Sequence, residues 1–279
     1  MRKKTKRISP VIFADVASMF FALLIFGVPF YFMLINSLKS RHEAALRNLR
    51  FPEVFLFENY IQVIQTNNFM IVRGFLNSLI ITAGSIALLL IVCSMGGYVL
   101  QRIKGKFMNG ISLLLLTGLM LPPAVLPTIW VLNILGIFPT IFGMIMIQVA
   151  LNIPFCTMLF RGYTATIPRE MEEAAYMDGC NSIVMYIRII FPLLKPVTAT
   201  VTVLSSVTIF NDFIHPLYFL PGARNPTVQL TLYNFMGRFG NDLHLLFACA
   251  ILITIPPLIL FIFLNKKIVS GITAGAVKG

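Results

Sequence analysis

The strongest constraint on the fold is a series of long apolar stretches that contain no charged residue. Residues 16–38, 74–101 and 107–160 lack Asp, Glu, Lys and Arg altogether. About 20 consecutive apolar residues are enough for one helix to cross the hydrocarbon core of a bilayer. Only 11% of the chain is charged, against about 25% in soluble domains. These properties exclude a water-soluble globular fold.

The stretches predict an all-α membrane protein with six transmembrane helices. Their side chains are apolar on every face, whereas the strands of a membrane barrel alternate between apolar and polar residues. Residues 107–160 are long enough for two spans, and Asn133, Gly136 and Pro139 predict a break between them at 132–139. We predict one transmembrane domain over residues 1–279, with spans at about 13–37, 75–100, 109–131, 140–160, 197–220 and 243–264.

The distribution of basic residues indicates how these spans are oriented. If the N-terminus is cytosolic, 15 of the 22 Lys and Arg residues fall on inner segments and 7 on outer segments. A cytosolic surplus of basic residues is the usual topology signal of membrane proteins. We therefore predict that both termini are cytosolic. The net charge of +12 then reflects membrane orientation rather than nucleic-acid binding.

The inner segment 161–196, between the fourth and fifth spans, contains the signals of a short cytosolic helix. Pro168 suits the first turn of a helix, and Gly179 suits the left-handed residue that ends one. Three carboxylates complement the positive end of the helix dipole: Glu170, Glu172 and Glu173. A second helical run is predicted at about 182–190, where the prolines at 192 and 196 stop it.

This segment also carries a motif at fixed spacing. Glu173-Ala174-Ala175 is followed by three residues, Gly179, nine residues, Ile189, one residue and Phe191-Pro192. The motif resembles the EAA loop of the permeases of ATP-binding-cassette importers, with Phe191 where the family has Leu. Further resemblances to this family are Asn77-Ser78-Leu79, Gly97-Tyr98 and the C-terminal residues 271–279, which are similar to the tail of its maltose-type permeases. The resemblance implies a carbohydrate importer.

The resemblance further implies a multi-pass permease subunit in the bacterial cytoplasmic membrane. The implied partners are a second, distinct permease, two ATPase subunits and an extracytoplasmic sugar-binding protein, with no nucleic acid. The ATPases would dock on the EAA loop, and the implied coupling residues are Glu173, Ala174, Ala175, Asp178 and Gly179. The chain has no G-x-x-x-x-G-K-[ST] phosphate loop. ATP and Mg²⁺ are therefore expected on the partner ATPase, and we expect no cofactor, metal or enzymatic activity on this chain.

A polar pair in the fifth predicted span, Asn211 and Asp212, is the candidate substrate pathway. Ionisable groups within a span are costly and usually face the bundle interior or water. Sugar hydroxyls need amide and carboxylate partners, and this pair supplies both. Counted from an inner start near Thr198, Asp212 would lie about 20 Å along the helix, in the outer half of the membrane. The alternative role for the pair is a hydrogen bond between helices.

Three other functions stay open at this point. The EAA loop alone would also fit an importer of the same type with a non-sugar cargo. An ion-coupled secondary transporter would need inverted repeats and ion ligands near the membrane midplane, and the sequence displays neither. A membrane enzyme is disfavoured because His42, His215 and His244 are far apart and no nucleophile–base signature accompanies them.

Overall fold

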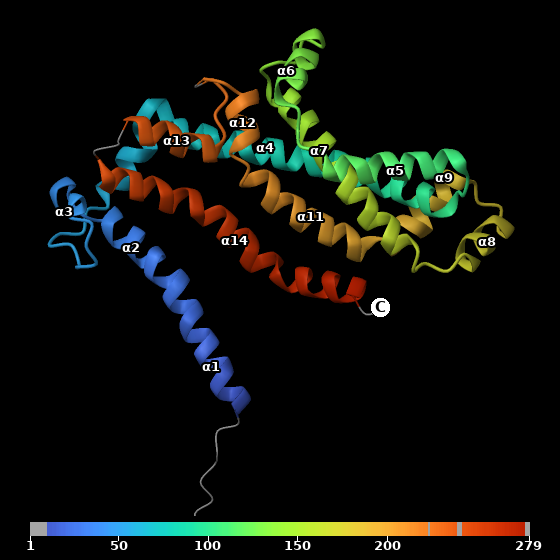
Figure 1. The fold of residues 1–279 in the computed structure, drawn as a ribbon, viewed down its shortest axis with the longest axis horizontal. Helices are drawn as coiled ribbons and strands as arrows, with labels where there is room; N and C mark the ends of the chain where they lie inside the picture. Colours follow the sequence, from blue (N-terminus) through green and yellow to red (C-terminus); the bar gives the residue numbers. More distant parts are fainter. Residues whose placement is uncertain (1–9, 223, 239–241, 277–279) are drawn as a thin grey trace, which may run out of the picture. The chain divides into compact units, whose positions relative to one another are not determined.

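The computed structural model describes residues 10–222, 224–238 and 242–276, and this part of the chain is helical apart from its turns and loops (Figure 1). Two segments are π-helices, Leu23–Gly27 and Tyr186–Ile190. The α-helices are α1 (Pro10–Ala22), α2 (Val28–Ser37), α3 (Arg41–Ala45), α4 (Glu58–Arg102), α5 (Lys106–Met120), α6 (Val125–Ile134), α7 (Ile141–Thr164), α8 (Glu170–Met177), α9 (Ser182–Met185), α10 (Phe191–Leu193), α11 (Lys195–Phe210), α12 (Ile214–Phe219), α13 (Val228–Arg238) and α14 (Leu243–Ala276).

The chain divides into two compact units. Unit 1 comprises Met1–Phe69 and Leu232–Ile255, and unit 2 comprises Met70–Thr231 and Pro256–Gly279. Helix α4 is interrupted at the boundary between the units, because residues 66–69 leave the right-handed helical conformation. Three of them, 67 to 69, have the positive φ angles of the left-handed region. Helix α4 therefore consists of two helical stretches, one in each unit.

Unit 1 contains a buried lysine directly after α2. Lys39 is 1% exposed, and its ammonium group donates to Asn36 Oδ1 and to the main-chain carbonyl and Oδ1 of Asn48. Burial lowers the pKa of Lys39. The side-chain amide of Asn59 donates to the carbonyls of Ser37 and Lys39 and so joins the end of α2 to the start of α4. The three acceptors around the ammonium group offset its loss of water.

A capping box begins α3 in the same unit. The Ser40 hydroxyl accepts from the main-chain N–H of Glu43 at 3.3 Å, and the Glu43 carboxylate accepts from the main-chain N–H of Ser40 at 3.1 Å. The Glu43 carboxylate also accepts from the main-chain N–H of Glu53 at 3.0 Å. The bond from Glu53 and the bonds from Ser40 together lower the pKa of Glu43.

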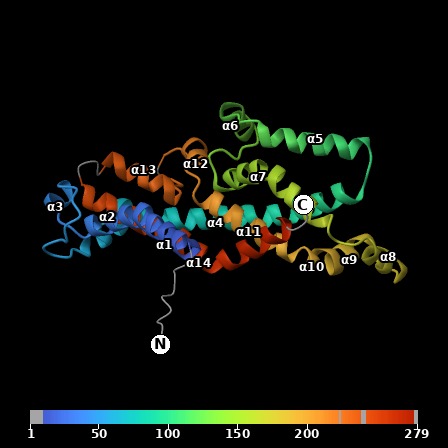
Figure 2. The same cartoon turned by 60° about the horizontal axis from the view of Figure 1, so that its bottom comes forward.

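Unit 2 is a helix bundle built around α7. Helices α5, α11 and α12 each pack against α7. Many of the buried residues of α7 belong to the apolar core, including Met144, Ile147, Val149, Cys156 and Phe160. In both views, α8 and α9 lie at the end of the bundle where α4 passes into α5 (Figures 1 and 2). Every element of the inner segment therefore lies at one end of this unit.

Glycines allow α4 to approach α7 closely. A Cβ atom placed on Gly97 would lie 2.6 Å from Cβ of Phe160 and 2.7 Å from the main-chain nitrogen of Arg161. A Cβ atom on Gly84 would lie 2.9 Å from the end of the Ile145 side chain. Such close approach of backbones is typical of helix packing in lipid. The order of these contacts also shows that the second stretch of α4 and α7 run in the same direction.

Helices α5 and α11 run antiparallel to α7. Arg161, near the end of α7, donates to the hydroxyl of Ser112 near the start of α5 at 2.9 Å. Gln148, in the first half of α7, donates to Asp212 just beyond the end of α11 at 2.5 Å. The helices α4, α5, α7 and α11 therefore alternate in direction along the chain.

Two of the predicted spans are not single straight helices. Residues 109–131 lie on α5 and α6, and this pair is bent by 119°. The bend falls at Pro122 and Pro123, which cannot continue the hydrogen-bond ladder of a helix. The predicted span 197–220 also ends early: α11 stops at Phe210, residues 211–213 are not helical, and the short helix α12 follows. The predicted bounds of these spans give neither the bend at 121–124 nor the early end of α11.

The helical run after Gly179 is longer than predicted. It begins at Ser182, as expected, but it continues without interruption through the π-helix into α10 and ends at Leu193. Pro192 lies just after the π-helix, in the last turn of the run. The chain then bends by 71° into α11. Pro192 therefore does not stop the run.

Other predicted helix boundaries agree with the structure. The predicted break at 132–139 is confirmed, because α6 ends at Ile134 and α7 begins at Ile141. Within the described residues, three helices are long and apolar enough to cross a membrane, Asp15–Ser37, Glu58–Arg102 and Ile141–Thr164, and there are five if each bent pair counts as one span. The sixth predicted span lies on α14. The last three residues of the predicted tail 271–279 lie outside the described residues.

Candidate functional site

Helix α8 is the short helix predicted for the inner segment. Its first turn holds Glu170, Glu172 and Glu173, which favours helix formation at the positive end of the dipole. Gly179 follows the helix with a φ of +80°, as predicted. The main-chain N–H of Cys180 bonds back to the carbonyl of Ala175, which satisfies a carbonyl at the end of the helix. Only glycine adopts this left-handed turn at little cost.

The five predicted coupling residues all lie on α8 or in its C-terminal turn, but they do not share one surface. The side chains of Glu173, Ala174 and Asp178 are exposed, and Gly179 is exposed as well. Ala175 is 4% exposed and faces the protein interior. A partner that covers α8 from outside would therefore contact four of the five residues, and Ala175 would support the helix from below.

An apolar surface surrounds these residues. Met177 is 88% exposed, and further large apolar side chains on α8 and the following run are exposed: Met171, Tyr176, Ile183 and Ile187. Exposed apolar side chains beside charged ones suit a protein interaction site. The composition of the inner segment is therefore compatible with a docking surface.

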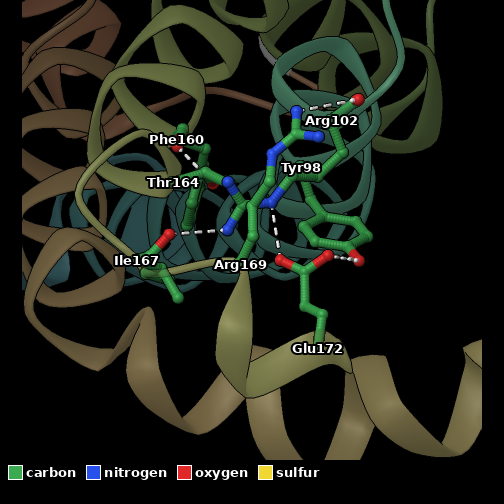
Figure 3. A network of polar contacts seen from close by, with 7 residues as sticks. All are labelled: Tyr98, Arg102, Phe160, Thr164, Ile167, Arg169 and Glu172. Carbon is green, nitrogen blue, oxygen red and sulfur yellow. Dashed lines mark hydrogen bonds and ion pairs between the residues drawn. The ribbon is translucent and has the colours of Figure 1, made fainter. Parts of the chain in front are cut away.

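Glu172, which the sequence motif does not single out, is held inside the protein (Figure 3). Its Oε1 atom lies 2.5 Å from Nε of Arg102, and its Oε2 atom accepts from the hydroxyl of Tyr98 at 2.9 Å. Arg102 also donates to the carbonyl of Ile167 at 2.8 Å, and Arg169 donates to the carbonyl of Arg102 at 3.4 Å. These bonds join α8 and the loop before it to the end of α4. No pattern in the sequence relates residues 70 positions apart, so this contact could not be predicted.

A second contact joins the same end of α4 to the helical run after Gly179. The hydroxyl of Tyr186 donates to the hydroxyl of Ser94 at 2.7 Å. The rings of Tyr186 and Tyr98 lie 5.5 Å apart between centroids. Burial raises the pKa of Tyr186, so the phenol stays protonated and able to donate at physiological pH.

The candidate substrate residue Asp212 lies in a pocket of unit 2 that has both apolar and polar lining residues. The pocket has a volume of about 330 Å³ and is lined by Gly118, Leu119, Leu121, Pro123, Gln148, Leu151, Asn152, Thr208, Asp212 and His215. Gln148 is 3% exposed and donates to Asp212 Oδ2. The same carboxylate oxygen lies 2.7 Å from Nδ1 of His215. The carboxylate therefore joins α7 to α12, which is the alternative role that the sequence left open.

Asn211 does not join this group. Its side chain is exposed, donates to the carbonyl of Val207 at 3.0 Å and accepts from the side-chain amide of Gln229 at 3.1 Å. The structure instead shows two partners of Asp212 that the sequence analysis did not predict, Gln148 and His215. Gln148 could have been found in the sequence as a long polar side chain inside the fourth predicted span, where such residues are rare.

Residues 226–231, which follow the fifth predicted span, pack on the start of the second predicted span. The side-chain amide of Asn77 donates to the carbonyl of Pro226 at 2.9 Å, and the main-chain N–H of Val228 donates to the hydroxyl of Ser78 at 3.0 Å. A Cβ atom on Gly74 would lie 2.9 Å from the Thr231 side chain. The polar pair at the start of this span therefore fixes the segment.

The sequence is similar to known transport proteins along most of its length. Residues 93–274 match the family described as binding-protein-dependent transport system inner membrane component. The chain is 33% identical over 281 residues to the melibiose/raffinose/stachyose import permease protein MelC of Bacillus subtilis (strain 168), covering 100% of this chain and 99% of MelC. It is 32% identical over 253 residues to the probable starch degradation products transport system permease protein AmyC of Thermoanaerobacterium thermosulfurigenes, covering 90% and 91%.

The fold is similar to that of a solved transporter. A chain in the crystal structure of a bacterial ABC transporter involved in the import of the acidic polysaccharide alginate superposes with a TM-score of 0.77. The match covers 94% of this chain and 99% of that chain at 21% identity. At this level of identity, the similarity establishes the fold and not the cargo.

Proposed function

Because the chain belongs to the family of binding-protein-dependent transport system inner membrane components, we propose that it forms one half of the membrane pore of an ATP-driven sugar importer. The observation that carries this proposal is the exposed helix α8 with its EAA motif, surrounded by exposed apolar side chains. Such a surface suits the docking of a partner subunit that supplies the energy of ATP hydrolysis.

Sugar is the proposed cargo because the similar permeases MelC and AmyC are described as transporters of sugars or starch degradation products. The pocket around Asp212 also presents the amide, hydroxyl, carboxylate and imidazole groups that bond to sugar hydroxyls. Asp212 is therefore a proposed contact of the substrate pathway, and Asn211, which lies outside this pocket, is proposed as the second contact from the sequence pair alone. An importer of the same type with a non-sugar cargo is the competing function, and an ion-coupled secondary transporter is a more distant one.

The proposed topology has six transmembrane helices, both termini in the cytosol and one permease domain over residues 1–279 in the bacterial inner membrane. The alternating directions of α4, α5, α7 and α11 support it, since they match the order that the second to fifth spans require. The inner segment 161–196 would then lie at the cytosolic end of unit 2. Its basic neighbours Arg102, Lys106 and Arg161 belong to the same end of the bundle, as the distribution of basic residues requires.

In the proposed complex, this chain pairs with a second permease. A sugar-binding protein delivers the substrate to the pair from outside, and two ATPase subunits bind the pair on the cytosolic side. Glu173, Ala174, Ala175, Asp178 and Gly179 would form the coupling site. ATP and Mg²⁺ would bind to the ATPases, and this chain would bind no cofactor of its own. Within the described residues, no three His, Cys, Asp or Glu side chains form a group that could hold a metal ion.

The decisive experiment is affinity purification of the chain from detergent-solubilised membranes, followed by identification of the proteins that accompany it. We expect a second permease and an ATPase with a phosphate-binding loop. In proteoliposomes, the complex with its binding protein should take up sugars from a panel of labelled oligosaccharides only when ATP is enclosed with the ATPase. Uptake driven by an ion gradient without ATP would contradict the proposal.

The charge reversal Glu173→Lys tests the coupling site. It should weaken ATPase binding by at least about tenfold, as expected for a central interface residue, and abolish uptake without affecting membrane insertion. The matched control is Glu53→Lys, which reverses an exposed charge on the predicted outer segment. If Glu173→Lys supports normal uptake, α8 is not the docking site.

A further inference from the structure

One face of α4 contacts both helical parts of the inner segment, α8 and the helical run after Gly179. Ser94, Tyr98 and Arg102 are spaced by four residues, so they lie in one row along the helix. Tyr98 and Arg102 bond to Glu172 of α8, and Ser94 bonds to Tyr186 in the run after Gly179. A single row of side chains therefore holds both helices of the helix-turn-helix.

Glu172 is the centre of this arrangement. Each carboxylate oxygen has its own donor, and the side chains of Arg102 and Glu172 are only 11% and 12% exposed. An ion pair that is largely removed from water and fully hydrogen-bonded has a defined geometry. Glu172 is therefore largely withdrawn from the surface, whereas the neighbouring Glu173 is exposed.

The row is itself fixed to the rest of the bundle. Gly97 lies between Ser94 and Tyr98, and its backbone packs directly on Phe160 and Arg161 of α7. The end of α4 can therefore transmit a displacement to α7 through close backbone contact. Without the Glu172 bonds, α8 would keep its packing at Ala175 and against α9 but would lose its hydrogen bonds to α4 from within the helix.

We propose that Glu172 is a positioning residue that clamps the coupling helix α8 to the cytosolic end of α4, so that movement of the docked ATPase is passed directly to α4. This inference rests on the proposed function and adds to it that two adjacent glutamates have different roles. Glu173 faces the ATPase, and Glu172 faces the membrane helix. Loss of the clamp leaves docking intact and uncouples ATP hydrolysis from transport.

The test measures sugar uptake per ATP hydrolysed in proteoliposomes that contain the complete complex and its sugar-loaded binding protein. Glu172→Gln and Arg102→Gln should still copurify with the ATPase and hydrolyse ATP. Their uptake per ATP should fall by at least about fivefold, the lower end of typical coupling between sites. The double variant Glu172→Arg, Arg102→Glu restores an ion pair with the two charges exchanged. It should recover a substantial part of the uptake per ATP that the single variants lose.

Matched variants distinguish the loss of the Glu172 bonds from the loss of ATPase docking and from misfolding. Glu170→Gln removes an exposed carboxylate from the same turn of α8 and should leave the ratio unchanged. Glu173→Gln should instead reduce the amount of ATPase that copurifies. An unchanged ratio in Glu172→Gln and Arg102→Gln would overturn the clamp, as would a loss of ATPase binding in these variants equal to that in Glu173→Gln. If the wild-type complex shows no ATP-dependent uptake, the proposed function itself fails.

Discussion

At the scale of single residues, adjacent positions in one motif have different surroundings. Glu172 and Glu173 are both acidic, and the sequence predicted correctly that both belong to the first turn of a helix. The sequence could not show that one carboxylate turns inward, because its partners Tyr98 and Arg102 are more than 60 positions away. Local signals such as Gly179 were predictable because a left-handed turn depends only on the residue that adopts it.

The close contact at Gly97 leads to a first prediction. Gly97→Ala should lower the thermal stability of the detergent-solubilised subunit, because the new Cβ would overlap with Phe160 and with the backbone at Arg161. Overpacking of this kind costs about 1–3 kcal/mol. Gly110→Ala is the control, since a Cβ there meets nothing within 4 Å. Equal melting temperatures for the two variants would show that α4 and α7 do not pack as described.

The capping box leads to a prediction about pH. The pKa of Glu43 is lowered in the folded state, so its contribution to stability is present above the unfolded pKa of about 4.3 and is lost as the pH falls through the lower folded value. Glu43→Gln should be less stable than the wild type at pH 7, and the difference should shrink towards pH 3. Thermal unfolding between these pH values measures it.

The control for this series is Glu53→Gln, which alters an exposed carboxylate on the same segment and leaves the main-chain donor to Glu43 in place. Its stability should follow that of the wild type at every pH. A constant difference between Glu43→Gln and the wild type would mean that the carboxylate is not hydrogen-bonded as in the structure.

At the scale of helices, the sequence predicted which stretches are apolar but not where each helix bends. The break at 132–139 was predictable because glycine and proline cluster there, whereas the sharp turn at 121–124 was missed although it also holds prolines. The early end of α11 has a local cause. The Asn211 side chain donates to the carbonyl of Val207, which also accepts the last helical N–H, and the Asp212 carboxylate accepts the main-chain N–H of His215. Side chains therefore compete with helical hydrogen bonds at this point.

Asp212 provides a prediction at this scale, since it holds α7 and α12 together. Asp212→Ala should destabilise the subunit by about 1–3 kcal/mol, because the buried amide of Gln148 would lose its acceptor. Asp212→Asn keeps one of the two acceptor oxygens and should therefore lower the melting temperature less than Asp212→Ala does. If Asp212 also contacts substrate, Asp212→Asn should raise the KM for uptake several-fold. Unchanged uptake in this folded variant would restrict Asp212 to a structural role.

At the scale of the whole molecule, the alternating directions of α4, α5, α7 and α11 agree with the apolar stretches, and the contacts between these helices could not be predicted from them. The native cysteines offer a direct test of the proposed topology. Cys93, Cys156 and Cys249 are buried, and Cys180 after α8 is partly exposed. A thiol reagent that cannot cross membranes should therefore label the chain in inside-out vesicles and not in intact spheroplasts.

Cys180→Ala should remove this labelling and serves as the control. Because the residue lies beside the proposed docking site, copurified ATPase should also slow the reaction. Labelling from the outside of intact spheroplasts would place the EAA loop on the wrong side of the membrane and contradict the proposed orientation of every span.

The length of α11 has a consequence for the newly made chain. Its 16 residues rise about 24 Å, whereas the hydrocarbon core is about 30 Å thick. In the proposed topology, Asp212 would therefore lie below the lipid headgroups, where hydrocarbon cannot solvate it. Its partners Gln148 and His215 belong to the same subunit, so the newly made chain satisfies this carboxylate only once α7 and α12 have packed around it.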